Sequence, residues 1–298
     1  MTLTRAALVF VLLTTAQPAY SGKPAPPQPG TSNPEIGYIR ISGGSRNQYE
    51  LILSNEDGTG RSIIYSTRDI GQMAVHLGPR ADRTFALVQG GKISIGTYKE
   101  VATGLALNSL TPIYNGNHVG AIDAEFSRDG DSIVYMRNAT MQIWRYDVSS
   151  GVQTMLVDLP TYGGGMSISR DGATVYYMEN ESPNVFALKS VPMAGGAPTD
   201  MGLRGYFLDT EAANTKDELL LTEHFAGADR LKRYDLASGT LTHVTNGYEP
   251  GYKCDDSRIV YVLNTGRDVS VLYRDEPSGA PGTLSTSGLY WPDYMPTC

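Results

Sequence analysis

Short apolar runs rich in β-branched and aromatic residues, separated by polar turns, recur along the chain, and the clearest pair predicts a β-hairpin. Ser132–Arg137 (SIVYMR) and Met141–Asp147 (MQIWRYD) carry side chains that suit a pleated, partly buried surface. A Ser-Arg-Asp-Gly turn precedes the first run and a Ser-Ser-Gly turn follows the second. Asp and Gly tolerate the backbone angles that a chain reversal needs. One hairpin buries too little apolar surface to be stable alone, so we expect it to recur.

The turn that closes this hairpin recurs with a nearly constant spacing. Each copy ends in glycine, and successive glycines lie 40 to 47 residues apart. The six glycines are Gly60, Gly104, Gly151, Gly196, Gly239 and Gly279. This period is that of a four-stranded blade of a β-propeller. Six turns therefore predict six blades, whereas a β-sandwich with similar hairpins would show no fixed period.

A second turn, built around aspartate, opens each blade and gives the same count only if the C-terminus belongs to the first blade. Five copies lie between the first and last glycine turns, at Asp82, Asp129, Asp171, Asp217 and Asp256. The sixth is Asp293, whereas the first blade begins at Ile36–Ile41 with no such turn before it. We therefore expect Leu289–Asp293 to be the innermost strand of the first blade. This exchange closes the ring and leaves no exposed seam.

These patterns predict an all-β protein: a six-bladed β-propeller of four-stranded antiparallel blades, closed by a C-terminal strand that completes the N-terminal blade. We expect the propeller at residues 36–298, after a signal peptide at residues 1–21 and a Pro- and Gly-rich linker at residues 22–35. The second blade departs from the pattern. Its outer turn is lengthened by the sequence VATGLALNSL, and we expect its last strand only at Pro112–Asn115.

Three stretches resemble the repeats of TolB-type propellers, whose blades follow a Trp/Phe-Ser-Pro-Asp-Gly sequence and then an Ile-x-Phe/Tyr strand. They are FSRDGDSIVYM, SISRDGATVYYM and YELILSNEDGTG. The resemblance covers about Ile36 to Asp293 and implies a periplasmic propeller that binds partners. Two features differ from the family. Arg128 and Arg170 replace the proline of the turn, and only the short linker stands where TolB has a mixed α/β domain. The resemblance therefore identifies a class of repeat and implies no role in the Tol envelope system.

The overall charge argues against one class of partner. The 298 residues carry a formal net charge of −7, and the pI is near 5.1. An acidic surface repels the phosphate backbone, so we expect no nucleic-acid partner. We expect the propeller to be a monomer.

The N-terminus has the features of a secretory signal peptide. Within Met1–Ser21, Arg5 supplies the positive charge and Ala6–Leu13 the apolar core, and Ala19 and Ser21 are small residues at the −3 and −1 cleavage positions. The apolar run is too short to span a bilayer. We therefore expect a periplasmic or secreted protein with no membrane span.

The two cysteines agree with export. Cys254 lies at the foot of the last blade's inner strand, and Cys298 ends the chain five residues after Asp293. In an oxidising compartment a Cys254–Cys298 disulfide would pin the closing strand, across a long loop of chain. The alternative is two free thiols, one of them on a frayed terminus.

Candidate ligand-binding residues gather on one predicted face. The loops that enter each inner strand and those that join the second and third strands share a face, here called the upper face, and binding sites on such scaffolds are built from loops. An aromatic and carboxylate rim suits a peptide segment or a saccharide, because Tyr offers flat contact area with a polar tip. Tyrosines at blade junctions also commonly pack between sheets. The candidates are Tyr162, Tyr206, Tyr248, His118, Asp123, His224, Glu249 and Arg204.

Signatures of catalysis are few. Gly163–Gly165 resembles a phosphate-binding loop, but no helix with Lys or Ser/Thr follows it, and the chain has neither a Gly-x-Ser-x-Gly elbow nor a His-Glu-x-x-His pair. Asp82, Asp129 and Asp171 belong to the opposite, lower face, where we expect them to cap turns. We therefore expect no catalytic residue, no cofactor and no bound metal.

Two main functions fit these observations, beside a third, a structural domain whose native partner is a neighbouring gene product. The first is a non-enzymatic exported propeller that binds a protein or glycan of the cell envelope through its upper face. The second is a metal-assisted lyase or hydrolase acting on polysaccharide, with the metal held near the channel by His118, His224 and Asp123. The two differ in whether these three side chains cluster and in whether the purified protein contains metal.

Overall fold

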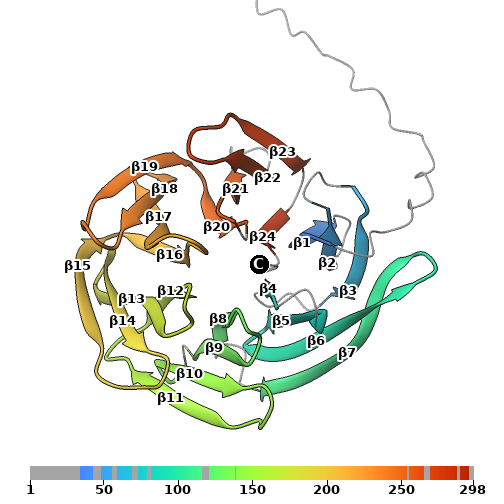
Figure 1. Cartoon of the computed structure of the whole chain (residues 1–298), viewed down its shortest axis with the longest axis horizontal. Coiled ribbons are helices and arrows are strands. Elements are labelled where there is room, and N and C mark those ends of the chain that lie inside the picture. The colour runs from blue at the N-terminus through green and yellow to red at the C-terminus, as the bar shows by residue number, and fades with distance from the viewer. Residues whose placement is uncertain are drawn as a thin grey trace, which may run out of the picture.

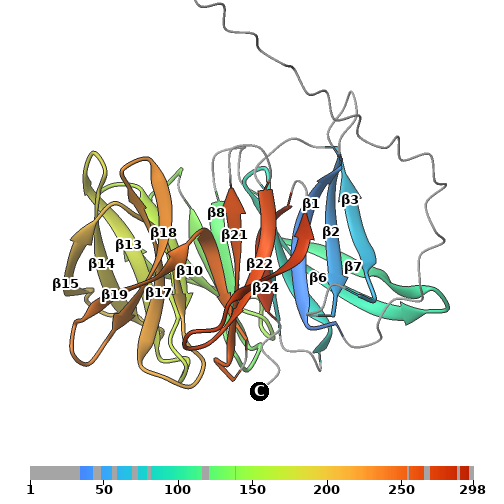
Figure 2. The same ribbon diagram turned by 90° about the horizontal axis from the view of Figure 1, so that it is seen from above.

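The chain forms a wheel of six blades around a central axis. The computed structural model describes residues 34–42, 48–55, 59–68, 73–78, 82–115, 121–137, 139–253, 255–264, 269–286 and 289–294. All 24 elements are β-strands, grouped in six four-stranded antiparallel sheets (Figure 1). Seen edge-on, the strands of each blade run between the two faces of the wheel (Figure 2). The predicted fold class is confirmed.

Each blade is given from the axis outwards. Blade one consists of β24 (Leu289–Tyr294), β1 (Ile36–Ser42), β2 (Gln48–Ser54) and β3 (Ser62–Thr67). Blade two consists of β4 (Met73–Leu77), β5 (Thr84–Gln89), β6 (Lys92–Val101) and β7 (Gly104–Asn115). Blade three consists of β8 (Ala121–Phe126), β9 (Ser132–Arg137), β10 (Gln142–Asp147) and β11 (Gln153–Asp158).

The other three blades follow the same order. Blade four consists of β12 (Gly163–Ile168), β13 (Thr174–Ser182), β14 (Val185–Pro192) and β15 (Thr199–Gly205). Blade five consists of β16 (Phe207–Ala212), β17 (Glu218–Phe225), β18 (Ala228–Asp235) and β19 (Leu241–Asn246). Blade six consists of β20 (Tyr248–Tyr252), β21 (Arg258–Asn264), β22 (Val269–Asp275) and β23 (Pro281–Thr286).

The C-terminal strand closes the ring as predicted. β24 pairs antiparallel with β1, with Ile36 opposite Tyr294 and Arg40 opposite Leu289. Both ends of the wheel thus share one sheet, and the first blade gains its innermost strand from the end of the chain. Closure of this kind leaves no seam between the first and last blades.

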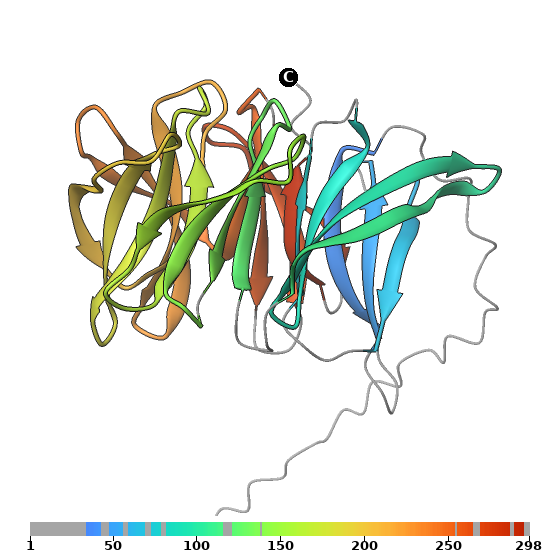
Figure 3. The same ribbon diagram turned by 90° about the horizontal axis from the view of Figure 1, so that it is seen from below.

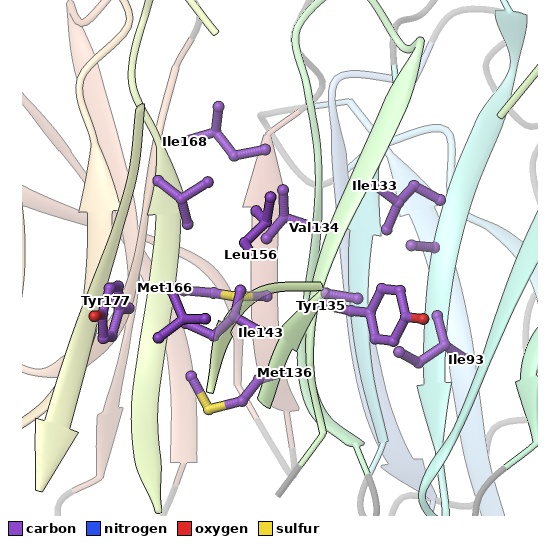
Figure 4. Close-up of a cluster of buried hydrophobic side chains, with 14 of the residues drawn as sticks. Ile93, Ile133, Val134, Tyr135, Met136, Ile143, Leu156, Met166, Ile168 and Tyr177 are labelled. Atoms are coloured by element: carbon purple, nitrogen blue, oxygen red, sulfur yellow. The ribbon is translucent and has the colours of Figure 1, made fainter. Parts of the chain in front are cut away.

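The core lies between neighbouring blades. In β9 the four central residues, Ile133–Met136, are all buried, because the sheets of blades two and four pack on its two faces. Figure 4 shows the resulting contacts, with Ile93 of blade two on one side of Tyr135 and Met166 of blade four near Met136. A strand covered on both faces reads as a continuous apolar run, as the SIVYMR sequence does.

The aspartate turns act as predicted on the lower face. Asp129 accepts hydrogen bonds from the Ser127 hydroxyl at 2.6 Å and from the Asp131 amide at 3.0 Å. Asp171 makes the equivalent bonds with Ser169 and Ala173 at 2.6 and 3.0 Å. These carboxylates are occupied in shaping the reversal between the first and second strands of their blades.

The long outer turn predicted for blade two is wrong. β6 continues to Val101 and β7 begins at Gly104. The inserted sequence therefore forms a hairpin that projects past blade one (Figure 3). Tyr98 and Leu105 are buried in a cluster with side chains of blade one, and the Leu105 amide donates to the Ser62 hydroxyl at 3.1 Å. The extension becomes strand because a neighbouring blade supplies a surface for it to cover.

Several predicted features lie outside the described residues. These are the leader, nearly all of the linker, His118, and both cysteines of the predicted disulfide. They stay predictions. Within the described part of the chain, no helix is long and apolar enough to cross a membrane.

Candidate functional site

A row of ring side chains, the aromatic row, crosses the upper face of blades four and five. The Tyr162 ring packs edge-on against Phe186, with the ring centroids 5.9 Å apart. Phe186 stacks on Tyr206 at 6.2 Å, and Tyr206 meets the His224 imidazole at 5.0 Å. Phe186 is buried, whereas 46% of Tyr162 is exposed. The row therefore has a buried centre and an end that a ligand can reach.

The connectivity of the blades brings these four rings together. Tyr162 and Tyr206 directly precede the inner strands β12 and β16, and Phe186 and His224 flank turns that join second and third strands. Both kinds of position lie on the upper face. Three of the predicted ligand-binding residues thus lie in one row. The sequence analysis did not include Phe186 among the candidates. Its position next to the turn that joins the second and third strands of blade four was the only signal that could have found it.

The row ends at the tip of the β17–β18 hairpin. A two-residue turn at Ala226–Gly227, with φ of +51° and +78°, closes the hairpin at this tip. Phe225 is 52% exposed, and the Arg230 guanidinium lies 4.5 Å from its ring centroid. On the same hairpin, His224 Nδ1 is 2.7 Å from Asp229 Oδ1. The tip thus presents an exposed aromatic ring close to an anchored carboxylate.

Arg204 is held at the outer edge of blade four. Its Nε lies 2.7 Å from Glu181, and its Nη1 donates to Asp200 at 2.8 Å. These bonds with Asp200 raise the pKa of Arg204 and lower the pKa of Asp200. The guanidinium is fixed by two carboxylates, which suits a structural rim position.

The two candidates of blade six begin its inner strand. Tyr248 packs against the cluster formed by residues such as Ile36 and Val260, and it lines a surface pocket. Glu249 is half-buried at a φ of +50°, where the pairing of β20 with β21 shifts register between Tyr248 and Gly251. The bulge turns this start of the blade towards the upper face.

Asp123 lies on the inner strand β8, in the wall of the central channel. Its Oδ1 is 3.0 Å from His76 Nε2 of blade two, and its Oδ2 accepts the Met166 amide of blade four at 3.0 Å. One carboxylate thus ties together the inner strands of three blades. Its neighbour on the same side of β8, Glu125, accepts the Ile168 amide in the same way at 3.1 Å.

The triple glycine makes room for a second channel carboxylate. A Cβ on Gly165 would lie 2.1 Å from Asp209 Oδ1 and 2.6 Å from its Cα. Enclosure by the channel wall, and then the nearby Asp123 carboxylate, raise the pKa of Asp209 to about 7. Gly163–Gly165 is therefore strand β12, with no part in phosphate binding. Sequence reasoning missed Asp209, because no turn or motif marks it.

The lower end of the channel is braced by one of the arginines that replace proline. Arg128 of blade three donates to the Asn214 carbonyl and to its side-chain oxygen, both at 2.7 Å, in the first turn of blade five. Asp256 of blade six accepts the Asn214 amide at 2.7 Å. One cavity of about 50 Å³ at this end of the channel is lined by His76 and Arg128, among other described residues. This has room for water molecules and not for a sugar ring.

The described residues offer no metal centre. Within them, no group of three or more His, Cys, Asp or Glu side chains could hold an ion. Of the three residues considered as metal ligands, Asp123 pairs with His76 in the channel and His224 pairs with Asp229 on the rim. The third, His118, lies outside the described residues.

Solved structures share this fold. TolB from Acinetobacter baumannii superposes with a TM-score of 0.72 at 16% identity, over 90% of this chain and 68% of that one. The TolB-like protein of Agrobacterium tumefaciens gives 0.65 at 15% identity, over 90% of this chain and 100% of that one. The resemblance to TolB-type propellers is thus confirmed as a likeness of fold.

An enzyme of known structure also shares this fold. An oligogalacturonate lyase from Vibrio parahaemolyticus superposes with a TM-score of 0.51 at 10% identity, over 85% of this chain and 72% of that one. Models of known protein families and curated protein sequences give no match. The fold therefore does not decide between binding and catalysis. That choice depends on the chemistry of the residues at the site.

Proposed function

We propose that this protein is an exported, non-enzymatic propeller that binds a protein or glycan of the cell envelope through the upper face of blades four to six. The aromatic row carries the proposal. It joins loops of two blades and leaves Tyr162 exposed beside the buried ring of Phe186, and Phe225 is exposed on the neighbouring hairpin tip. Exposed aromatic side chains of this kind supply contact area at little cost in conformational entropy.

Binding suits the geometry better than catalysis does. Asp209, the channel carboxyl whose pKa is raised to about 7, lies close to Asp123, and the cavity that His76 lines nearby is too small for a sugar ring. The upper face instead offers a broad surface with fixed side chains. The signal-peptide pattern of Met1–Ser21 supports export, and N-terminal sequencing of the mature protein checks it, with Gly22 expected as the first residue.

Capture of a partner tests the proposed face. Purified protein is immobilised and exposed to cell-envelope extract, and the retained protein and glycan are identified and quantified. We expect Tyr162→Ala and Tyr206→Ala to reduce recovery of the same partner at least tenfold. Val152→Ala, which removes an exposed apolar side chain near a lower-face turn, should leave recovery unchanged. Equal recovery by all variants, with thermal unfolding unchanged, would reject the upper face as the binding surface.

A further inference from the structure

A second feature of the upper face is a pocket between blades five and six. It has a volume of about 370 Å³, within the range of small-ligand sites. Gly227–Asp229 at the tip of the β17–β18 hairpin form one wall, and Leu263–Asn264 at the end of β21 form the other. The link Asn246–Tyr248 forms the floor. The pocket is therefore built from the same loops as the end of the aromatic row.

The pocket is rigidly framed. The Gly247 amide donates to the Asp229 carbonyl at 3.0 Å, which ties the hairpin to the floor. Gly247 has a φ of +142°, and a Cβ there would lie 2.6 Å from the Tyr261 ring. Only glycine fits this position, so the floor is held close against β21. Preorganised walls reduce the entropy that binding would otherwise cost.

One residue of the wall, Asp229, carries a carboxylate that is held on one side by a histidine. Asp229 Oδ1 lies 2.7 Å from His224 Nδ1, and the His224 ring is itself packed against Tyr206. Among the described residues, His224 is the one side chain that hydrogen-bonds this carboxylate, so Oδ2 is available. About 30% of the Asp229 side chain is exposed. His224 thus links the pocket to the aromatic row as a positioning residue.

The lining selects a class of ligand. The lining residues Asn246 and Asn264 carry amides, Asp229 carries a carboxylate that accepts hydrogen bonds, and Tyr248 carries a ring with a hydroxyl. Leu263 adds an apolar side. Sugar hydroxyls both donate and accept, so they match this set. No lysine or arginine is among the described residues that line the pocket, so an anionic ligand would meet the Asp229 carboxylate with no counter-charge from these residues.

We propose that this pocket binds one ring of a neutral oligosaccharide, with Asp229 as the main acceptor and with the chain continuing past His224, the end of the aromatic row that adjoins the pocket. This rests on the proposed function, because it names a glycan as the ligand of the upper face. An extended glycan suits the arrangement, since the pocket and the row meet at the Asp229–His224 pair.

Titration with defined sugars tests the proposal. Purified mature protein is titrated with chitotriose, maltotriose, cellotriose and mannotriose, with trigalacturonate as the acidic comparison, by calorimetry and saturation-transfer NMR. We expect saturable binding of at least one neutral trisaccharide and weaker binding of trigalacturonate. Asp229→Asn should weaken that binding tenfold to a hundredfold, as loss of a hydrogen bond to a charged group does. Ala228→Trp, an exposed position in the pocket wall, should abolish it.

The controls separate this proposal from the broader one. Asp131→Asn, on an exposed lower-face turn, should bind as the wild type does. Binding of no neutral sugar, or binding that Asp229→Asn and Ala228→Trp leave unchanged, would overturn the saccharide site. Preference for trigalacturonate or for a lysine-rich peptide would do the same. If envelope capture still depends on Tyr162 and Tyr206 and recovers a protein, the proposed function stands while this inference falls.

Discussion

Two small features of single residues shape the channel of this propeller. Gly165 lacks a side chain, and Asp209 occupies the space that a Cβ would need. Asp209 in turn lies close enough to Asp123 for the two carboxylates to interact. The triple glycine thus has a packing role, and the acidic pair gives the inside of the wheel a titratable group.

Replacing Gly165 with alanine should destabilise the fold. The new Cβ would meet the Asp209 Cα at 2.6 Å, which is backbone that cannot rotate away. We expect a loss of about 3 kcal/mol in the free energy of unfolding, measured by urea denaturation. Gly172→Ala is the matched control, because that site has open space and costs only its φ of +69°, about 1 kcal/mol. Equal effects at both sites would contradict the crowding at Gly165.

Ionisation of Asp209 should make stability depend on pH. Its pKa is raised to about 7, so the folded protein binds a proton that the unfolded chain releases near pH 4. The free energy of unfolding should therefore fall as the pH rises from about 4 to about 7. By pH 8 this loss is about 4 kcal/mol, because each pKa unit corresponds to about 1.4 kcal/mol.

The Asp209→Asn variant isolates this effect. It cannot ionise, so its urea midpoint should change less than that of the wild type between pH 5 and pH 8. The free energy of unfolding of the variant, relative to that of the wild type, should rise by about 3 kcal/mol between pH 5 and pH 8. Two parallel curves across this range would show that Asp209 is ionised in the folded state at every pH tested.

At the scale of elements, the two arginine turns differ in what they hold. Arg128 reaches the first turn of blade five through bonds to both oxygens of Asn214. Arg170 bonds the carbonyl of the next residue, Thr215, at 2.8 Å but is more exposed. Aspartate and glycine thus set the shape of these turns. The arginine that replaces proline in each turn hydrogen-bonds to another blade.

Arg128→Pro tests this bracing role. Proline suits the position in a turn of this type, yet it cannot donate to Asn214. We expect a loss of about 2 kcal/mol, similar to that of Arg128→Ala, because hydrogen bonds from a charged group to partly buried acceptors are lost. Arg170→Ala should cost less than about 1 kcal/mol. If Arg128→Pro left the free energy of unfolding unchanged, the shape of the turn would matter for stability and the hydrogen bonds to Asn214 would not.

The β6–β7 hairpin should stabilise blade one through its buried residues. Leu105 is 5% exposed against blade one, whereas Val101 near the tip is 40% exposed. Leu105→Ala should therefore lower the free energy of unfolding by about 2 kcal/mol. Val101→Ala should change it by less than about 0.5 kcal/mol. Similar small effects for both variants would show that the hairpin does not cover blade one in solution.

At the scale of the whole molecule, the number of blades and the closing strand could be predicted from the sequence. The contacts of side chains inside the channel could not. Turns such as Asp129–Gly130 are local chemistry at a fixed period, so the sequence displays them directly, and the unmatched Asp293 revealed the strand exchange. The β6–β7 extension depends on burial against another blade. The Asp123–Asp209 pair depends on which inner strands meet across the axis. Such contacts between distant residues leave no local pattern.

The candidate site was predictable to the same limited degree. Tyr162, Tyr206 and His224 could be placed on one face because connectivity alone decides which loops share a face. Phe186, which joins them into a row, and Asp229, which anchors His224, required the structure. The contacts of both side chains join residues from different strands, which no local pattern in the sequence marks.

Hydrogen exchange of the protein with and without its captured envelope ligand tests the central claim most directly. Binding to the upper face of blades four to six should slow exchange in segments 159–164, 203–208, 223–230 and 246–249. The lower-face turns at 127–131 and 169–173 should exchange at unchanged rates. Protection of these lower-face turns, or of the β6–β7 hairpin, with none in the four upper segments would contradict the account.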